Sequence, residues 1–163
     1  MTRIINTINL NKKIAYLQKL KSLNKESGLI FNSLDNILND FIGHKLFTIL
    51  KFDKINSNLE RIYTSKPREY PLQGKKDVIR NFWQVQVLEK GIAFIGYNFQ
   101  DIKASFSDFD LIKKLGCSSV LIIPVKSGDN IKGSVNLLHE ESLYSDNDVK
   151  GAQKIVQLIS EVL

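Results

Sequence analysis

The sequence predicts a single α+β domain, and three observations support that prediction. Apolar residues follow a helical spacing at both ends of the chain, as where Ile14, Leu17, Leu20 and Leu23 recur every third residue. Between the ends, short apolar runs rich in β-branched and aromatic residues alternate with turn residues, as antiparallel strands do. At 163 residues the chain is long enough to bury about two thirds of its unfolded surface in one core.

The terminal segments are expected to be helical. After the first pattern comes the break 24–28, and a second pattern then runs through Ile30, Leu34 and Phe41. We expect either one kinked helix or a short arm followed by a helix packed on the sheet, and we divide the chain into a helical arm, 1–27, and a domain, 28–163. At the other end, Ser145 and Asp148 form the pattern of a capping box, followed by an amphipathic helix.

The middle of the chain predicts strands and two shorter helices. Strands are expected at 46–52 and 59–65 on either side of an Asn-Ser-Asn turn, and strict alternation would place Arg61, Tyr63 and Ser65 on one face. A helix is expected at 77–90, ending at Gly91, then a strand at 92–96 and a helix from Ser107 to about 116. The continuous apolar run 119–125 predicts a central strand, joined by a hairpin turn to a strand at 132–139.

Composition and charge narrow the possible functions. The formal net charge is +6, but the lysines are dispersed rather than gathered in a stripe with aromatic residues, so nucleic-acid binding is not predicted. No apolar run approaches the ~20 residues needed to span a bilayer, and the N-terminus has no secretory pattern. The single cysteine is consistent with a reducing compartment, so we expect a cytoplasmic protein without a membrane partner.

The order of these elements resembles a GAF domain over about residues 28–163. The resemblance is strongest in 115–125, Leu-Gly-Cys-Ser-Ser-Val-Leu-Ile-Ile-Pro-Val, followed by Gly128, Gly133 and Asn136-Leu-Leu. The segment from Arg61 to Pro71 also resembles short stand-alone bacterial GAF proteins with an R-x-Y-x-S-x-P-x-x-Y-P pattern. The resemblance implies a GAF-like (PAS-related) antiparallel sheet with N- and C-terminal helices on one face. It further implies a helical or loop insertion that roofs a small-molecule pocket on the other face.

Three functional branches of this family can be compared with the chain. Cyclic-nucleotide-binding GAF domains carry an Asn-Lys signature, and here Leu137 follows Asn136. The methionine sulfoxide reductase branch needs a nucleophilic and a resolving cysteine, whereas this chain has only Cys117. Bilin attachment also uses a cysteine, but no neighbouring His-bearing bilin motif is present. Enzymatic activity and a bound cofactor are therefore not predicted.

Nine residues are the candidate ligand contacts, and each has a purely structural alternative. A guanidinium can pair with a carboxylate or phosphate, and the aromatic rings can stack on a ligand or simply fill the core. The thiol is more simply explained as a small buried hydrophobe, and the charged residues of 101–110, such as Asp108, are expected to be solvated. With histidines only at His44 and His139, no metal site is predicted. The candidates are Arg61, Tyr63, Ser65, Tyr70, Trp83, Phe106, Cys117, Ser119 and Asn136.

The expected function is that of a sensory or regulatory domain that binds an unknown small molecule and has no output domain of its own. It would act through a homodimer formed by the terminal helices, or through a separate partner. The alternatives are an interaction module whose pocket is filled by its own side chains, and a single-cysteine enzyme resembling methionine sulfoxide reductases.

Overall fold

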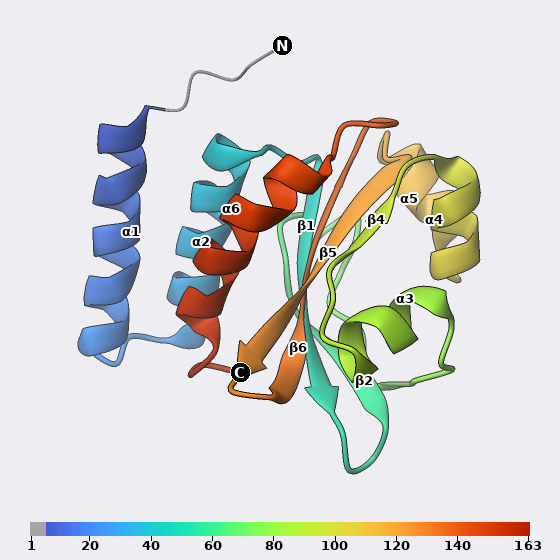
Figure 1. The fold of residues 1–163 in the computed structure, drawn as a ribbon, viewed down its shortest axis with the longest axis horizontal. Helices are drawn as coiled ribbons and strands as arrows, with labels where there is room; N and C mark the ends of the chain where they lie inside the picture. Colours follow the sequence, from blue (N-terminus) through green and yellow to red (C-terminus); the bar gives the residue numbers. More distant parts are fainter. Residues whose placement is uncertain (1–5) are drawn as a thin grey trace.

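A computed structural model describes residues 6–163, which form one layered α+β arrangement around a six-stranded sheet (Figure 1). Neighbouring strands in the sheet are antiparallel, in the order β3-β2-β1-β6-β5-β4. The strands are β1 (Leu46–Asp53), β2 (Asn58–Thr64), β3 (Lys76–Asp77), β4 (Phe94–Gly96), β5 (Ser119–Ser127) and β6 (Asn130–His139). The helices are α1 (Thr7–Ser22), α2 (Ser27–Phe41), α3 (Phe82–Gln84) with a π-helical turn η1 (Val85–Glu89), α4 (Phe99–Ser105), α5 (Phe109–Lys114) and α6 (Asp146–Val156) with a 3₁₀ turn η2 (Gln157–Ile159).

Helices cover both faces of the sheet. On one side α2 and α6 pack on the strands, and α1 lies outside α2, where Leu17 and Leu20 are buried (Figure 1). On the other side α3, α4 and α5 form a roof (Figure 1). Each side has its own apolar cluster: Ile49 and Leu137 belong to the helix-side cluster, whereas Leu138 belongs to the roof-side cluster. The predicted α+β architecture, with terminal helices on one face and an insertion on the other, is confirmed.

The ends of several elements follow the predicted local signals. Ser145 and Asp148 form the capping box at the start of α6. The continuous run Ser119–Ser127 is an interior strand of the sheet, as its apolar sequence indicates. Gly91 ends the η1 turn with a φ of +65°, a conformation that favours glycine because it has no Cβ.

No helix among the described residues has the length and hydrophobicity of a membrane span.

The domain division at residue 27 stays a prediction, and residues 1–5 of the predicted arm lie outside the described residues. Helix α1 is separate from α2, which agrees with the interpretation of an arm followed by a helix packed on the sheet.

The helix expected at 77–90 begins later than predicted. Lys76 and Asp77 pair with β2 as a short strand, and Arg80 has a φ of +54°, which is incompatible with a continuous helix. Asn81 then caps α3, and Phe82 at its start is 76% exposed. The helix predicted from Ser107 corresponds to α5, which starts two residues later, at Phe109. A separate helix that was not predicted, α4, precedes it.

A bulge in β2 changes the direction of its side chains. Ile49 pairs with Tyr63 and Leu50 pairs with Arg61, so Ile62 has no partner in the register. Adjacent residues of β1 point to opposite faces of the sheet, and their partners Arg61 and Tyr63 therefore do so as well. The prediction that strict alternation puts Arg61 and Tyr63 on one face is wrong.

Candidate ligand-binding cavity

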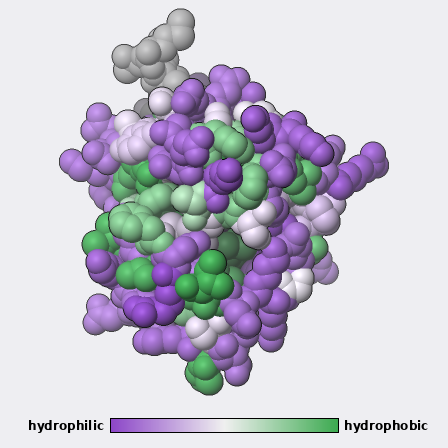
Figure 2. Space-filling view, turned by 90° about the vertical axis from the view of Figure 1, so that its right-hand side faces the viewer, coloured by the Kyte–Doolittle hydropathy of each residue, from purple (hydrophilic) through white to green (hydrophobic). Residues whose placement is uncertain are grey.

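A cavity of about 270 Å³ lies between the sheet and the roof. The sheet contributes apolar side chains from β1, β2 and β6, and the roof contributes Trp83, Phe106 and Ile112. On the face that carries α3, α4 and α5, hydrophobic side chains gather around a hollow (Figure 2). One exposed apolar residue, Ile79, lines the cavity from the loop that precedes α3. The cavity thus has apolar walls on the sheet side and on the roof side.

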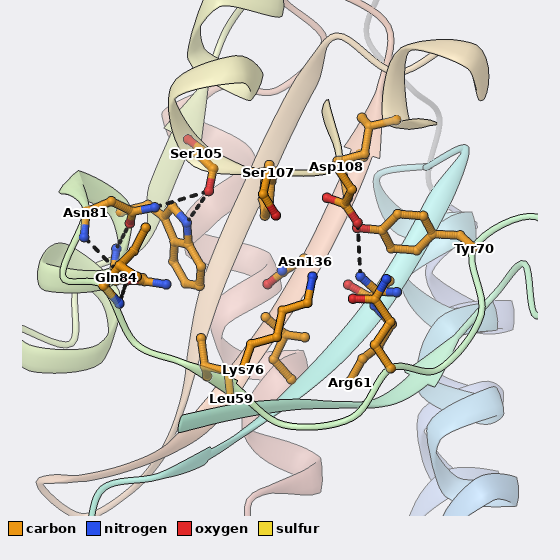
Figure 3. Close-up of a pocket in the computed structure, with 18 of the residues that line it drawn as sticks. Leu59, Arg61, Tyr70, Lys76, Asn81, Gln84, Ser105, Ser107, Asp108 and Asn136 are labelled. Carbon is orange, nitrogen blue, oxygen red and sulfur yellow. Dashed lines mark hydrogen bonds and ion pairs between the residues drawn. The ribbon is translucent and has the colours of Figure 1, made fainter. Parts of the chain in front are cut away.

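At one end of the cavity, Arg61 joins the sheet to the roof (Figure 3). Its side chain is only 8% exposed, and its guanidinium carbon lies 3.7 Å from the centre of the Tyr70 ring. One terminal nitrogen donates to the carbonyl oxygen of Pro71 at 2.6 Å, and the other lies 3.4 Å from the carboxylate of Asp108. The Nε–H of Arg61 is buried and has no acceptor within residues 6–163. The positive charge is therefore held in place with part of its hydrogen-bonding capacity unused.

Tyr70 and Asp108 complete this end of the cavity. Burial of the Tyr70 hydroxyl is the main reason why its pKa lies well above the ordinary value, and the positive charge of Arg61 partly opposes that rise. The Asp108 carboxylate and its hydrogen bond with the phenol raise the pKa of Tyr70 further. Tyr70 is consequently a neutral phenol at neutral pH. The carboxylate of Asp108 is engaged by both Arg61 and Tyr70, so the expectation that Asp108 is solvated is wrong.

A group of hydrogen bonds among α3, the residues before it and Ser105 stabilises the other end of the cavity. The indole N–H of Trp83 and the side-chain amide of Asn81 both donate to the carbonyl oxygen of Ser105, at 3.0 and 3.1 Å. The carbonyl oxygen of the Gln84 side chain accepts from the backbone N–H groups of Ile79 and Asn81, at 3.0 and 3.3 Å. These contacts fix the indole as a wall and leave the Nε2 of Gln84 without a partner in the described chain (Figure 3).

Asn136 and Lys76 present further donors to the cavity. Asn136 is 2% exposed and lies on β6, where its carbonyl oxygen accepts from the hydroxyl of Ser134 at 2.8 Å. Its Nδ2 has no partner within residues 6–163. Lys76 comes from β3, and its ammonium end points into the cavity toward Asn136 (Figure 3).

Five of the nine sequence-predicted residues lie together around this cavity, and whether they bind a ligand stays a prediction. They come from separate parts of the chain, which the fold brings together. Of the nine predicted residues, those that line the cavity are Arg61, Tyr70, Trp83, Phe106 and Asn136.

The other four predicted residues are not among its lining residues. The hydroxyl of Ser65 accepts from the backbone N–H of Phe47 at 2.9 Å. The hydroxyl of Ser119 donates to the backbone carbonyl oxygens of His139, at 3.3 Å, and of Glu140. Both hydroxyls are thus used to join segments of the backbone. Their expected place in the pocket wall is corrected.

Tyr63 lies on the opposite face of the sheet because of the bulge in β2. Its ring packs edge-on against Phe31 and Phe47, and its hydroxyl donates to the Asp35 carboxylate at 2.7 Å. The second Asp35 oxygen lies 2.6 Å from Nε2 of His44. Burial, followed by the hydrogen bond to Asp35, raises the pKa of Tyr63. Tyr63 therefore connects the sheet to α2.

Cys117 is a buried member of the roof-side cluster, 1% exposed. Burial raises the pKa of its thiol to about 11, although Lys45 and Lys66 oppose the rise. A thiol with this pKa is almost entirely protonated at neutral pH, and the thiolate is the nucleophile. The structure thus agrees with the interpretation of Cys117 as a packing residue.

Nine polar residues that line the cavity were missed as candidate contacts: Thr48, Gln73, Lys76, Asp77, Asn81, Gln84, Ser105, Ser107 and Asp108. One signal was available, because Asn81 and Gln84 have the spacing of a capping box. The places of Lys76 and Asp108 depend on how two loops fold back over the sheet, which no local pattern indicates.

Within the described residues, no group of three or more His, Cys, Asp and Glu side chains could hold a metal ion.

No protein-family profile and no curated protein sequence matches the chain. Among solved structures, the chain is similar to fRMsr of Staphylococcus aureus in complex with substrate, at 13% identity and a TM-score of 0.70, over 99% of this chain and 97% of that one.

Two further solved structures are GAF domains by name. The phycoerythrobilin-bound GAF domain from a cyanobacterial phytochrome is 13% identical, with a TM-score of 0.71, over 95% of this chain and 94% of that one. The GAF domain of a two-component sensor histidine kinase from Bacillus halodurans is also 13% identical, with a TM-score of 0.65, over 80% and 88% of the two chains. This chain has the fold of the GAF domains.

Proposed function

We propose that this chain is a regulatory GAF-type domain that binds a small molecule in the cavity between the sheet and the α3–α5 roof. The observation that carries the proposal is the cavity itself, which pairs apolar walls with a few fixed polar groups, as small-molecule sites do. A volume of about 270 Å³ suits a ligand of one or two rings. The structural neighbours support this reading, since their names include a phycoerythrobilin-bound domain and a substrate complex.

The two alternatives receive less support. An interaction module with a self-filled pocket would have no space beside Trp83, yet Trp83 lines the open cavity. A thiol-dependent enzyme would need an accessible thiolate, whereas Cys117 is buried and its pKa is raised to about 11.

Binding is tested by a metabolite library screened at neutral pH, with Trp83 fluorescence and thermal unfolding as the two readouts. A ligand at 100 times its Kd stabilises the folded state by about 2.7 kcal/mol, which raises the Tm of a chain of this size by roughly 5–10 °C. The expected result is a group of related compounds that change the fluorescence of Trp83 and raise the Tm together.

A matched pair of variants locates the binding. Leu59→Phe adds a ring at the cavity wall and should abolish the response, whereas Tyr63→Phe, on the same strand but the opposite face, should retain it. A library without any response, or a response that Leu59→Phe leaves unchanged, would contradict the proposal.

We also propose that the signal leaves the domain through a homodimer built on the terminal helices, because Tyr16 of α1, Leu23 directly after α1 and Leu29 of α2 are exposed. Light scattering of the wild type and of the Tyr16→Ser/Leu29→Ser variant tests this. The wild type should have twice the mass of one chain and the variant the mass of one. A wild type with the mass of one chain would contradict the proposal.

A further inference from the structure

The side-chain amides of the cavity have a common orientation. Gln84 uses its carbonyl oxygen for the backbone N–H groups of Ile79 and Asn81, and Asn136 uses its carbonyl oxygen for the hydroxyl of Ser134. Each amide is therefore left with its NH₂ group unpaired within residues 6–163. An NH₂ group only donates, so the free hydrogen-bonding capacity of both residues requires acceptors on whatever enters the cavity.

Two strong acceptors at opposite ends of the cavity are used by the protein. The carbonyl oxygen of Ser105 accepts from Trp83 and Asn81, and the carboxylate of Asp108 is engaged by Arg61 and Tyr70. The remaining carboxylate is that of Asp77, which is exposed on β3. The hydroxyls of Thr48 and Ser107 also line the cavity, and a hydroxyl can either donate or accept, so these two groups do not select between donors and acceptors on a ligand.

Two cations, Arg61 and Lys76, line the cavity together with these free donors, and Asp108 is the counter-ion of Arg61. Arg61 is nine-tenths buried and retains an N–H without an acceptor. Lys76 is exposed at the edge of the sheet, makes no ion pair within the described part of the chain, and directs its ammonium into the cavity (Figure 3). A charge-assisted hydrogen bond to a carboxylate is about twice as strong as a neutral one, and the guanidinium plane suits that planar group.

On this basis, which rests on the proposed function, we infer that the ligand is a small monocarboxylate with an apolar or aromatic body. Its carboxylate accepts hydrogen bonds from the free donors of Lys76, Asn136 and Gln84. Its body lies between the rings of the roof, Trp83 and Phe106, and the leucines of the sheet. One carboxylate matches the single unpaired cation, since Arg61 already has Asp108 as a counter-ion.

The inference is tested with phenylacetate and 3-phenylpropionate, each compared with the amide and the amine of the same length. Dissociation constants come from Trp83 fluorescence titration at neutral pH. We expect each acid to bind at least tenfold more tightly than its amide, because a hydrogen bond to a charged group contributes about 1.5–3 kcal/mol and 1.4 kcal/mol is tenfold. The amines should bind most weakly.

Two variants assign the effect to named donors. Gln84→Glu keeps the acceptor that holds Ile79 and Asn81 but replaces the free donor by a negative charge, so the acids should bind at least tenfold more weakly. Lys76→Gln should also weaken the acids, with a smaller effect on the amides. Its matched control is Lys75→Gln, since Lys75 is a neighbouring lysine that is not among the lining residues.

Two outcomes would overturn the inference and leave the proposed function intact. One is equal or tighter binding of the amides or amines, and the other is a library whose binding compounds contain no carboxylate. If Lys75→Gln weakened binding of the acids as much as Lys76→Gln does, the effect could not be assigned to the Lys76 ammonium in the cavity, and that assignment would be overturned. A library without any binding compound would overturn the inference and the proposed function together.

Discussion

Replacing Arg61 by methionine tests the polar end of the cavity. Methionine retains most of the volume of the side chain, so the main effect is loss of charge and hydrogen bonds rather than an empty space. The variant removes the donor to Pro71, the counter-ion of Asp108 and the cation over the Tyr70 ring. The contact with Asp108 joins the sheet to the roof, and those with Tyr70 and Pro71 join the sheet to the loop between β2 and β3.

The magnitude follows from the burial of the pair. Removing one partner of a fully buried ion pair costs about 3–5 kcal/mol, because the other charge remains buried. Here the side chain of Asp108 is 20% exposed and lies 3.4 Å from Arg61, and its hydrogen bond with Tyr70 remains. We therefore expect Arg61→Met to lower the free energy of unfolding by about 2–3 kcal/mol.

The assay is urea unfolding at pH 7, followed by Trp83 fluorescence and far-UV circular dichroism. Asp108→Asn in the Arg61→Met background removes the unpaired charge, so the double variant should be at least 1 kcal/mol more stable than the sum of the single effects predicts. The control is Arg80→Met, whose partner Glu89 is also exposed, and which should show no measurable loss. Additive single effects, or a loss no larger than that of the control, would refute the reasoning.

Three further predictions concern chemistry and packing. The thiol of Cys117 is buried and its pKa is raised to about 11, so it should resist iodoacetamide at pH 7.5 in the folded state and react once the protein is unfolded in urea. Rapid labelling of the folded protein would contradict this prediction. Burial raises the pKa values of Tyr63, Tyr70 and Cys117 in the folded state, so the unfolded chain loses these protons at a lower pH than the folded chain does. The stability that these groups contribute should therefore be fully present below about pH 8 and should fall as the pH rises from about 9 to 11. Urea titrations across this range check the slope, and a flat or rising stability would exclude the proposed protonation states. A Cβ at Gly133 would lie 2.0 Å from a backbone carbonyl oxygen of β1, so Gly133→Ala should cost about 1–3 kcal/mol or more by urea unfolding. At Gly74 an added Cβ meets nothing within 4 Å, and an equal loss for Gly74→Ala would refute the steric explanation.

The parts of the fold that local chemistry determines were predictable from the sequence. Ser145 and Asp148 mark the start of α6 because the cap is formed by residues three apart in the chain. The strand at Ser119–Ser127 follows from an uninterrupted apolar run, which only an interior position can bury on both faces. Such signals require no knowledge of distant segments.

The errors occur where tertiary contacts override the local pattern. The bulge at Ile62 turns Tyr63 toward α2, where the Tyr63 hydroxyl donates a hydrogen bond to the Asp35 carboxylate. The period-2 alternation of the sequence gives no sign of the extra residue that makes the bulge. The left-handed conformation of Arg80 delays the start of α3, although the apolar spacing around it resembles a helix. Asp108 reaches Arg61 across 47 positions of sequence, so its role in the cavity depends on the folded roof.

The most direct test of the central claim is the shift of side-chain NMR signals when the protein is saturated with phenylacetate. The side-chain amide signals of Gln84 and Asn136 and the indole N–H signal of Trp83 should all move, because these groups line the cavity. Shifts confined to the groove between α1 and α2, lined by Tyr16 and Leu29, would contradict the account and place the binding outside the cavity.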